Sequence, residues 1–489
     1  MTARFLALDL GAESGRAVVG EFRDARLAIR EVRRFANEPV RYNGALQWDI
    51  LRLWQEVRGA LDGVRDSPLA SIGVDAWGCD FGLLGERGNL LENPYHYRDS
   101  RTDGVMQAVT ALVPAERIYG STGVQFLPFN TLYQLYAACQ QTPLLIDSAA
   151  SLATIPDLLN YWLTGELRSE LTIASTTQFV DLRTRTWATD LLAELSIPTR
   201  LLPPLVEPGT VLGKVCEVAS KEHRGTRVVA PACHDTGSAV ASVAAGRRRA
   251  FLSSGTWSLL GTELREPIVT ERARVLNFTN EGGVCGTTRF LKNIAGLWLL
   301  QACRRGWSAA GQDYSYDELM TAAADDRHAF GSLIDPDCPD FLHPGDMAAS
   351  IAAFCRQTSQ AEPSGPPAYA RAVFESLAFK YRSVLDALED VTGISFDEIR
   401  VVGGGARNRL LNQFTADATG RPVVAGPVEA TALGNIAMQM IATGEVSSLD
   451  EARAVIERSF PVERYEPVNV ELWNRQYPRF REYLELTCA

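Results

Sequence analysis

The chain has 489 residues, of which 46% are hydrophobic and 22% are charged, and its formal net charge at pH 7 is −11. This is the composition of a globular protein with room for about two or three domains. An acidic chain lacks the basic surface of a nucleic-acid-binding protein, so we expect no nucleic acid among its partners.

The nine cysteines are scattered along the chain and never form a C-x-x-C pair. This is typical of reduced thiols in the cytoplasm rather than of a disulfide framework. An apolar run begins already at Phe5, without the layout of a signal peptide. No apolar run reaches the roughly 18 residues of a membrane span. We therefore expect a cytoplasmic protein that does not contact a membrane.

The first half of the chain alternates short apolar runs with amphipathic stretches. Residues 5–10 and 17–22 flank a turn over 11–15, so they are predicted to form a β-hairpin. The following patterns predict a helix over 51–61, a strand over 71–74 that ends at Asp75, helices over 129–139 and 156–163, and a strand over 228–232.

After residue 249 the order strand, small polar turn, strand returns. A strand over 250–254, the turn SGTWS and a second strand from Leu259 repeat the N-terminal hairpin, which indicates two related halves. The remaining patterns predict a helix over 297–302, a polar loop over 357–367, a helix over 368–388, a strand over 399–402 and a helix near Asn408. We place the boundary within AAGRRR, which gives domains 1–244 and 245–489, and the last helix could pack back on the first domain.

Three glycine-bearing turns follow predicted strands: DLGAESGR at 9–16, SSGTWS at 253–258 and VGGGARN at 402–408. Glycine at such turns lets backbone N–H groups approach phosphate oxygens closely. One such turn alone need only reverse the chain, but three of them, together with an aspartate at a strand end, favour a nucleotide site. By contrast, GTVLGKV at 209–215 is one residue short of a Walker A loop and has no Ser or Thr after its lysine.

Ionisable side chains near these turns indicate chemistry. Asp9 could hold Mg²⁺ through water, because this ion keeps several of its waters, or it could cap the turn. Arg16 could contact a phosphate oxygen or be a surface cation. Asp235 is a better general base than His234, because a hydroxyl needs only a positioned acceptor when it attacks a phosphoryl group in line. An ordinary pKa of about 4 would leave Asp235 ionised at pH 7.

These turns, in this order, resemble the two phosphate motifs and the adenosine motif of the actin-like ATPase superfamily. Longer stretches within residues 8–440 are similar to the FGGY carbohydrate kinases: IGVDAWGCDFGLL, YRDSR, GVQFLPFNTLYQL, NYWLTGE, CHDTGSAV, FLSSGTWSLLG, LKNIAGLWLLQ and PVEATALGNIAMQM. The resemblance implies an α/β fold of two related actin-like (ribonuclease H-like) ATPase domains with a cleft between them, which closes on the sugar.

The resemblance also implies an activity, which is phosphoryl transfer from ATP, with Mg²⁺, to the 1-hydroxyl of a ketose; the motifs indicate L-rhamnulose. The residues expected at ATP are Ala12, Glu13, Ser14, Gly15, Arg16, Thr256, Gln301 and Gly404. The residues expected at the sugar are Gly78, His234, Asp235, Thr236 and Asn293, with Asp235 as the base and Asp9 near the metal. Many FGGY kinases have Thr-Thr or Thr-Ser in the first hairpin, where this chain has Ala12, Glu13 and Ser14, and we expect Glu13 to face solvent.

Other functions stay open. A kinase for another ketose or polyol, such as L-fuculose, L-ribulose or D-xylulose, would use the same machinery. An actin- or chaperone-like ATPase switch shares the phosphate turns but gives no role to loop 234–236 with Asn293. A non-catalytic sugar sensor would not need Asp9, Arg16 and Asp235. The expected partners are a small sugar and ATP, and the protein is expected to be a monomer or a homodimer.

Overall fold

The computed structural model describes residues 2–243, 246, 248–325, 327, 329–342 and 344–488. The chain forms two compact units, each assembled from separate stretches. The first contains Met1–Ala245, Glu263–Phe290 and Ala430–Phe460, and the second contains Gly246–Thr262, Leu291–Glu429 and Pro461–Ala489. Residues 244 and 245, between which the domain boundary was predicted, lie outside the described residues. Two stretches that follow this boundary in the chain, Glu263–Phe290 and Ala430–Phe460, belong to the first unit.

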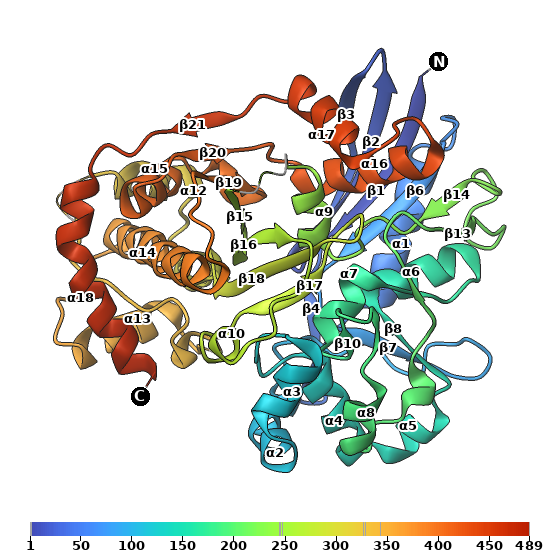
Figure 1. The fold of residues 1–489 in the computed structure, drawn as a ribbon, viewed down its shortest axis with the longest axis horizontal. Coiled ribbons are helices and arrows are strands. Elements are labelled where there is room, and N and C mark those ends of the chain that lie inside the picture. The colour runs from blue at the N-terminus through green and yellow to red at the C-terminus, as the bar shows by residue number, and fades with distance from the viewer. Residues whose placement is uncertain are drawn as a thin grey trace. The chain divides into compact units, whose positions relative to one another are not determined.

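A six-stranded sheet, in the order β13-β14-β6-β1-β2-β3, forms the centre of the first unit (Figure 1). Its strands are β1 (Ala3–Leu10), β2 (Ser14–Arg23), β3 (Arg26–Ala36), β6 (Ser71–Ala76), β13 (Val211–Lys214) and β14 (Arg227–Val229). Strand β1 is antiparallel to β2 and parallel to β6, which is in turn parallel to β14. The predicted N-terminal hairpin is confirmed, and three parallel strands end at one edge of this sheet.

The helices α16 (Ala430–Thr443) and α17 (Leu449–Ser459) belong to the first unit because they cover an apolar face of its sheet. Phe5 and Val18 of the sheet pack with Leu433 and Ile436 of α16 in one buried cluster. Gly20 leaves room for this contact, since a Cβ there would lie 2.7 Å from the Ile436 side chain. Figure 1 shows α16 and α17, in orange-red, beside the blue strands. The sheet and the helices both bury apolar surface at this contact, which stabilises the packing.

Smaller elements complete the first unit. Its other helices are α1 (Ile50–Asp62), α2 (Val105–Leu112), α3 (Ala115–Thr122), α4 (Thr131–Gln141), α5 (Pro143–Ser148), α6 (Ile155–Thr164), α7 (Leu171–Ala174), α8 (Thr189–Glu194), α9 (Asp235–Ala241) and α10 (Glu271–Val275). Short strands pair as β4 (Pro39–Tyr42) with β5 (Ala45–Trp48), β7 (Phe81–Leu84) with β8 (Ser151–Thr154), β9 (Ser169–Glu170) with β12 (Leu205–Val206), and β10 (Val180–Asp181) with β11 (Thr186–Trp187). The strand β17 (Thr279–Gly282) also lies in this unit.

Six strands of a seven-stranded sheet lie wholly or mainly in the second unit, in the order β18-β16-β15-β19-β20-β21. These strands are β15 (Arg249–Ser254), β16 (Trp257–Leu264), β18 (Thr288–Ala295), β19 (Glu398–Val402), β20 (Val423–Ala425) and β21 (Glu463–Tyr465). Strand β15 is antiparallel to β16 and parallel to β19. This repeats the pairing of β1 with β2 and β6, so the strand–turn–strand pattern predicted twice from the sequence occurs in both sheets.

Helices α11 (Trp298–Ala309), α12 (Tyr316–Ala323), α13 (Met347–Gln357), α14 (Pro366–Thr392), α15 (Arg409–Thr419) and α18 (Val470–Cys488) belong to the second unit. The long helix α14 exceeds its predicted limits because two prolines start it and Gly393, with φ 66°, ends it. The last helix, α18, packs Trp473 against Phe379 of α14 and Phe414 of α15. It therefore belongs to the second unit.

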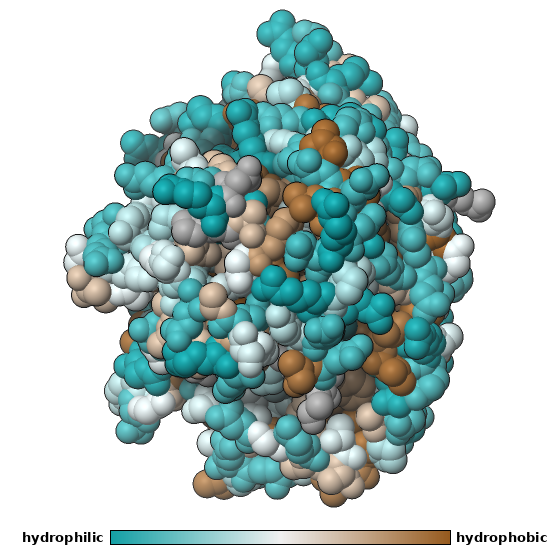
Figure 2. Space-filling view, turned by 90° about the vertical axis from the view of Figure 1, so that its left-hand side faces the viewer, coloured by the Kyte–Doolittle hydropathy of each residue, from teal (hydrophilic) through white to brown (hydrophobic). Residues whose placement is uncertain are grey.

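Among the described residues, no helix is both long and apolar enough to cross a membrane. The eight cysteines whose side chains are described are free thiols. Figure 2 shows a face on which hydrophilic residues predominate and hydrophobic ones form small separate groups. Single exposed apolar residues are normal on protein surfaces and do not by themselves mark an interface.

Candidate active site

An aspartate–arginine pair lies where the parallel strands β1 and β6 end. Asp9 of β1 is opposite Asp75 of β6 in the parallel register and opposite Arg16 of β2 in the antiparallel register. Arg16 Nε and Nη2 each lie 2.8 Å from Asp9 Oδ2. Ligands of α/β proteins commonly bind at the carboxyl ends of such strands. The structure thus joins two predicted site residues, Asp9 and Arg16, in one ion pair.

Asp75 is a buried neighbour of this pair, and the sequence analysis gave it no role. Its Oδ2 accepts a hydrogen bond from Asn435 Nδ2 at 2.5 Å, whereas its Oδ1 has no hydrogen-bond partner among the described residues. Burial, followed by the charge of Asp9, raises the pKa of Asp75 well above its ordinary value. An unsatisfied buried oxygen beside a carboxylate indicates that this edge of the sheet can take a further polar or cationic group.

A magnesium ion is the cation to test against this site. In the part of the chain that the structure describes, no group of three or more His, Cys, Asp or Glu side chains is arranged to hold a metal ion. Mg²⁺ often binds through one or two carboxylates and keeps several waters. Asp9, with one oxygen engaged by Arg16, and the unpaired Oδ1 of Asp75 fit a hydrated ion of this kind.

Helix α16 supports this edge through the stretch GNIAMQM. Gly434 lets α16 approach α9, because a Cβ at this position would lie 1.7 Å from a backbone oxygen of α9. The next residue, Asn435, holds Asp75 and accepts a hydrogen bond from Gln439 Nε2 at 2.7 Å. One short segment of α16 therefore determines the position of both Asp75 and the helix α9.

Asp235, the predicted base, is the first residue of α9. The residue before it, His234, forms a parallel β-bridge with Ala76, the last residue of β6, so Asp235 lies close to the end of that strand. Its Oδ1 accepts hydrogen bonds from Thr236 N at 2.5 Å and Thr236 Oγ1 at 3.2 Å, and His234 Nε2 lies 3.5 Å away. Its side chain is 28% exposed, so a ligand can reach it. Burial raises the pKa of Asp235, His234 lowers it and Asp9 raises it further. The ordinary pKa that we expected for Asp235 is therefore wrong, because desolvation was not visible in the sequence.

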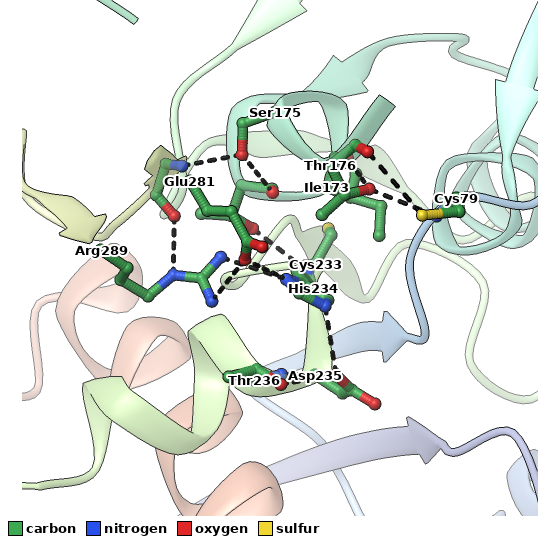
Figure 3. Close-up of polar contacts among 12 residues, drawn as sticks. Cys79, Ile173, Ser175, Thr176, Cys233, His234, Asp235, Thr236, Glu281 and Arg289 are labelled. Atoms are coloured by element: carbon green, nitrogen blue, oxygen red, sulfur yellow. Dashed lines mark hydrogen bonds and ion pairs between the residues drawn. The ribbon is translucent and has the colours of Figure 1, made fainter. Parts of the chain in front are cut away.

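A buried ion pair lies beside the His234 ring (Figure 3). Arg289 Nη2 lies 3.1 Å from His234 Nδ1, and Glu281 Oε2 lies 3.2 Å from the same nitrogen. Arg289 Nη1 lies 3.1 Å from that Glu281 oxygen, and Arg289 Nε donates to Gly282 O at 2.9 Å. Neither residue was predicted from the sequence, because no local motif marks Glu281 or Arg289.

Glu170 holds the main chain that leads to Asp235. Glu170 Oε2 accepts hydrogen bonds from Cys233 N at 3.0 Å and from Thr172 Oγ1 at 2.6 Å. The same Thr172 oxygen accepts a hydrogen bond from His234 N at 3.1 Å. Burial raises the pKa of Glu170 to about 7. This carboxyl group, also missed in the sequence, fixes the backbone of the loop that carries the predicted base.

The predicted sugar residue Gly78 is attached to the same segment. Cys79 has φ 73°, and its backbone N–H donates to Thr176 Oγ1 at 3.3 Å. A Cβ at Gly78 would lie 3.0 Å from that Thr176 oxygen, so the glycine permits the close approach. Residues 170–176 therefore connect the loop of Gly78 with the loop of Asp235.

The predicted ATP hairpin has its tip at the surface of the first unit. Gly15 packs under Phe35 of β3, because a Cβ at Gly15 would lie 2.2 Å from the aromatic ring. The packing of the sheet thus requires a glycine here in addition to any role at phosphate. Ala12 is half-buried, and Glu13 and Ser14 are exposed, which agrees with the expectation that Glu13 faces solvent.

In the second unit, the turn that carries Thr256 is bound to the end of β18. The backbone N–H groups of Gly296 and Trp298 donate to Thr256 O at 3.2 and 3.1 Å. A Cβ at Gly296 would lie 2.7 Å from Gly255 O, so only glycine fits this contact between two main chains. The turn after β15, the end of β18 and the start of α11 therefore form one joint.

The other predicted residues of the second unit lie around this joint. Asn293 lies on β18, and Gln301 lies on α11 with a buried Oε1 that makes no hydrogen bond to the described residues. Gly404 is exposed in the short helix that follows β19. Because β19 runs parallel to β15, this turn lies next to the end of β15. Thr256, Asn293, Gln301 and Gly404 thus gather in the second unit, and the remaining predicted residues gather in the first.

The chain is similar to a known family and to individual proteins. Residues 4–241 match the N-terminal domain, and residues 250–443 the C-terminal domain, of the FGGY family of carbohydrate kinases. A rhamnulokinase from Bacteroides thetaiotaomicron is 43% identical over 98% of this chain and 99% of its own length. A rhamnulokinase from Halalkalibacterium halodurans is 42% identical over 94% of this chain and 98% of its own.

Solved structures agree on the fold. The gluconate kinase of Lactobacillus acidophilus superposes with a TM-score of 0.81 at 18% identity, over 100% of this chain and 99% of its own. The xylulose kinase of Rhodospirillum rubrum gives a TM-score of 0.77 at 21% identity, over 98% of each chain. The predicted α/β fold of a two-domain sugar kinase is therefore confirmed.

Proposed function

This chain belongs to the FGGY family of carbohydrate kinases, and we propose that it transfers the γ-phosphoryl group of ATP to the 1-hydroxyl of L-rhamnulose. The products are L-rhamnulose 1-phosphate and ADP. Relatives of nearly the same length that bear the name rhamnulokinase support this choice of sugar. The observation that carries the reaction is the carboxylate of Asp235, whose Oδ1 is held by Thr236 while the side chain stays partly exposed.

In this mechanism, Asp235 accepts the proton of the 1-hydroxyl as the hydroxyl oxygen forms its bond to the γ-phosphorus. The bond from that phosphorus to the oxygen bridging the β-phosphate breaks, and ADP leaves with the electron pair. Such a reaction needs little covalent help, so positioning and charge stabilisation dominate. Because burial raises the pKa of Asp235, the ionised base is lost on acidification at a higher pH than for an ordinary aspartate.

The other predicted residues would bind the two substrates. Residues 12–16 with Thr256, Gln301 and Gly404 would contact ATP. The sugar would lie against Gly78, His234, Thr236 and Asn293. Mg²⁺ would be held through water at Asp9, with the Oδ1 of Asp75 nearby, and would supply positive charge to the phosphates. The protein would act as a monomer or homodimer with ATP and a small sugar as its partners.

The test is ADP release from MgATP with L-rhamnulose, L-fuculose, L-ribulose, D-xylulose or glycerol. We expect the highest kcat/KM with L-rhamnulose, and a decrease in kcat of about 10²–10⁴ in Asp235→Asn, the usual size of a general-base contribution. Asp49→Asn is the matched control, because Asp49 also begins a helix but asparagine caps it equally well. Higher kcat/KM with another sugar would contradict the substrate. ADP release that ignores every sugar and survives Asp235→Asn would contradict the kinase itself.

A further inference from the structure

The Arg289–Glu281 pair has no direct part in the proposed phosphoryl transfer, yet it is buried against His234. Arg289 is 0% exposed, Glu281 4% and His234 7%. Burying an arginine and a glutamate costs desolvation energy that the ion pair offsets only in part. A purely structural site could be filled by apolar side chains at less cost. The position of this pair around one imidazole nitrogen therefore indicates a role in controlling that ring.

The contacts around His234 Nδ1 determine which nitrogen carries the proton. A guanidinium has only donors, so Arg289 Nη2, at 3.1 Å, can bond to Nδ1 only when that nitrogen has a free lone pair. A neutral ring in this bond carries its proton on Nε2. If the ring becomes an imidazolium, Nδ1–H faces Glu281 Oε2 at 3.2 Å, and Nε2 again carries a proton. The neutral form with its proton on Nδ1 is the one that Arg289 disfavours.

The proton on Nε2 points toward the predicted base. His234 Nε2 lies 3.5 Å from Asp235 Oδ1, the same oxygen that accepts both hydrogen bonds from Thr236 (Figure 3). The two donors of Thr236 and the Nε2 of His234 therefore all lie beside Oδ1 of Asp235. No hydrogen bond from a described residue reaches its Oδ2. Asp9 and Asp75, the other acidic groups that face Asp235, add negative charge to the site, and Arg16 offsets it.

We infer that Arg289, paired with Glu281, is a positioning residue that keeps a proton on Nε2 of His234, so that the ring faces Oδ1 of Asp235 as a donor and leaves Oδ2 to accept the proton of the sugar hydroxyl. The inference rests on the proposed role of Asp235 as the base. His234 is consequently a donor throughout the reaction and never the proton acceptor. Arg289 and Glu281 act through His234 and need not touch either substrate.

The tautomer of His234 can be measured directly. The chain has five histidines, so the full-length protein with ¹⁵N-labelled histidine gives few long-range ¹H–¹⁵N signals, and His234→Gln assigns the one of interest. Without any sugar, we expect His234 to show the Nε2–H tautomer or the imidazolium. A wild-type spectrum with the Nδ1–H tautomer would overturn the inference, whatever the variants do.

Variants of Arg289 add a second readout. Arg289→Met should move His234 toward the Nδ1–H tautomer and lower kcat about 10- to 100-fold, the usual effect of losing a partner that orients a functional side chain. Its KM for ATP should not change. Arg289→Lys keeps a donor for Nδ1 and should retain the Nε2–H tautomer and most of the activity. An unchanged tautomer in Arg289→Met would contradict the inference.

Two further variants separate the role of the pair from general damage. Arg371→Met removes a buried arginine from another Arg–Glu pair, in the second unit, and should leave the His234 signals unchanged. Glu281→Gln should keep the Nε2–H tautomer, because Arg289 remains. If no sugar is phosphorylated but His234 shows the expected tautomers, the proposed function fails and the assignment of the ring stands. If the enzyme phosphorylates the sugar but His234 shows the Nδ1–H tautomer, the assignment of the ring fails and the proposed function stands.

Discussion

The two turns proposed to bind phosphate follow the same strand–turn–strand pattern, but different contacts hold them. In the first unit, Gly15 packs on the side chain of Phe35, and the Asp9–Arg16 pair crosses the hairpin. In the second unit, Gly296 packs on the main chain of the turn itself. A side chain can change its rotamer or be shortened, whereas two packed main chains have no such freedom. We therefore expect the first turn to tolerate changes that the second does not.

Two sets of carboxyl groups, one from each unit, have partners of different charge. In the first unit, Asp157 and Glu170 are bonded to hydroxyl and N–H groups, and burial raises the pKa of each to about 7. In the second unit, Asp335 and Asp337 share the ammonium group of Lys380, at 2.8 and 2.9 Å. Neutral partners allow a buried carboxyl group to take up a proton, whereas a cation pairs with its charged form.

The largest expected effect is that of Gly296→Ala. Its Cβ would be forced against Gly255 O, so the turn that carries Thr256 would have to move. A displacement of about 1 Å at a reacting group can cost about 10²-fold in rate. We expect kcat/KM for ATP to decrease by at least that factor, measured by ADP release. Gly306→Ala in α11 is the control, because nothing lies within 4 Å of a Cβ at this position. If this variant lost as much kcat/KM as Gly296→Ala, the contact with Gly255 O would not explain the loss.

Removing the cation of the second unit should give the next largest effect. Lys380→Met removes the cation that the buried Asp335 and the half-buried Asp337 share, and it loosens Asp337, whose Oδ1 accepts a hydrogen bond from Ala295 N at 2.8 Å. Breaking a buried ion pair costs about 3–5 kcal/mol of stability. Although burial lowers the pKa of Lys380, Asp337 and Asp335 raise it above its ordinary value. The wild-type stabilisation is thus complete at neutral pH and is lost only in strong alkali.

Urea unfolding measures this loss, and Lys221→Met, at an exposed lysine, is the control. If Lys380→Met and the wild type unfold at the same urea concentration at pH 8, Lys380 does not stabilise the joint between the turn after β15, the end of β18 and the start of α11.

A smaller and reversible effect is expected in the first turn. Gly15→Ala places a Cβ 2.2 Å from the Phe35 ring, and overpacking of this kind costs about 1–3 kcal/mol. The double variant Gly15→Ala with Phe35→Leu should recover most of the thermal midpoint, because the shorter side chain makes room. If the double variant is no more stable than Gly15→Ala, main-chain contacts, as in the second unit, and not the Phe35 side chain exclude a larger residue at position 15.

The smallest effect is a change in the pH dependence of stability. The folded pKa of Glu170 lies above its ordinary value of 4.5, at about 7, so the folded state binds the proton more tightly than the unfolded state does. Stability should therefore fall as the pH rises from about 4.5 to about 7, and then level off. Glu170→Gln should reduce this slope in urea unfolding, although Asp157 still titrates. Glu86→Gln, at an exposed site, should leave the slope as it is.

Several residues of the candidate site could be singled out from the sequence because their signals are local in the chain. Strand alternation and turn glycines specify the hairpin that carries Asp9 and Arg16. The abrupt end of an apolar run singles out Asp235. The long helix α14 and the repeated strand pattern follow equally from spacing. Each of these features depends on residues within about ten positions of one another, which is the range over which hydrogen bonding and apolar periodicity leave a trace in sequence.

The tertiary structure alone decided the surroundings of these residues. Glu281 and Arg289 meet His234 from strands that lie about 50 positions further along the chain, and Asn435 reaches Asp75 from 360 positions away. No local pattern marks such partners, because they meet only when distant segments bury their apolar faces together. The same burial removes water from Asp235 and raises its pKa. Asp235 could thus be singled out from the sequence as the candidate base, but the groups around it depend on how the folded chain excludes solvent.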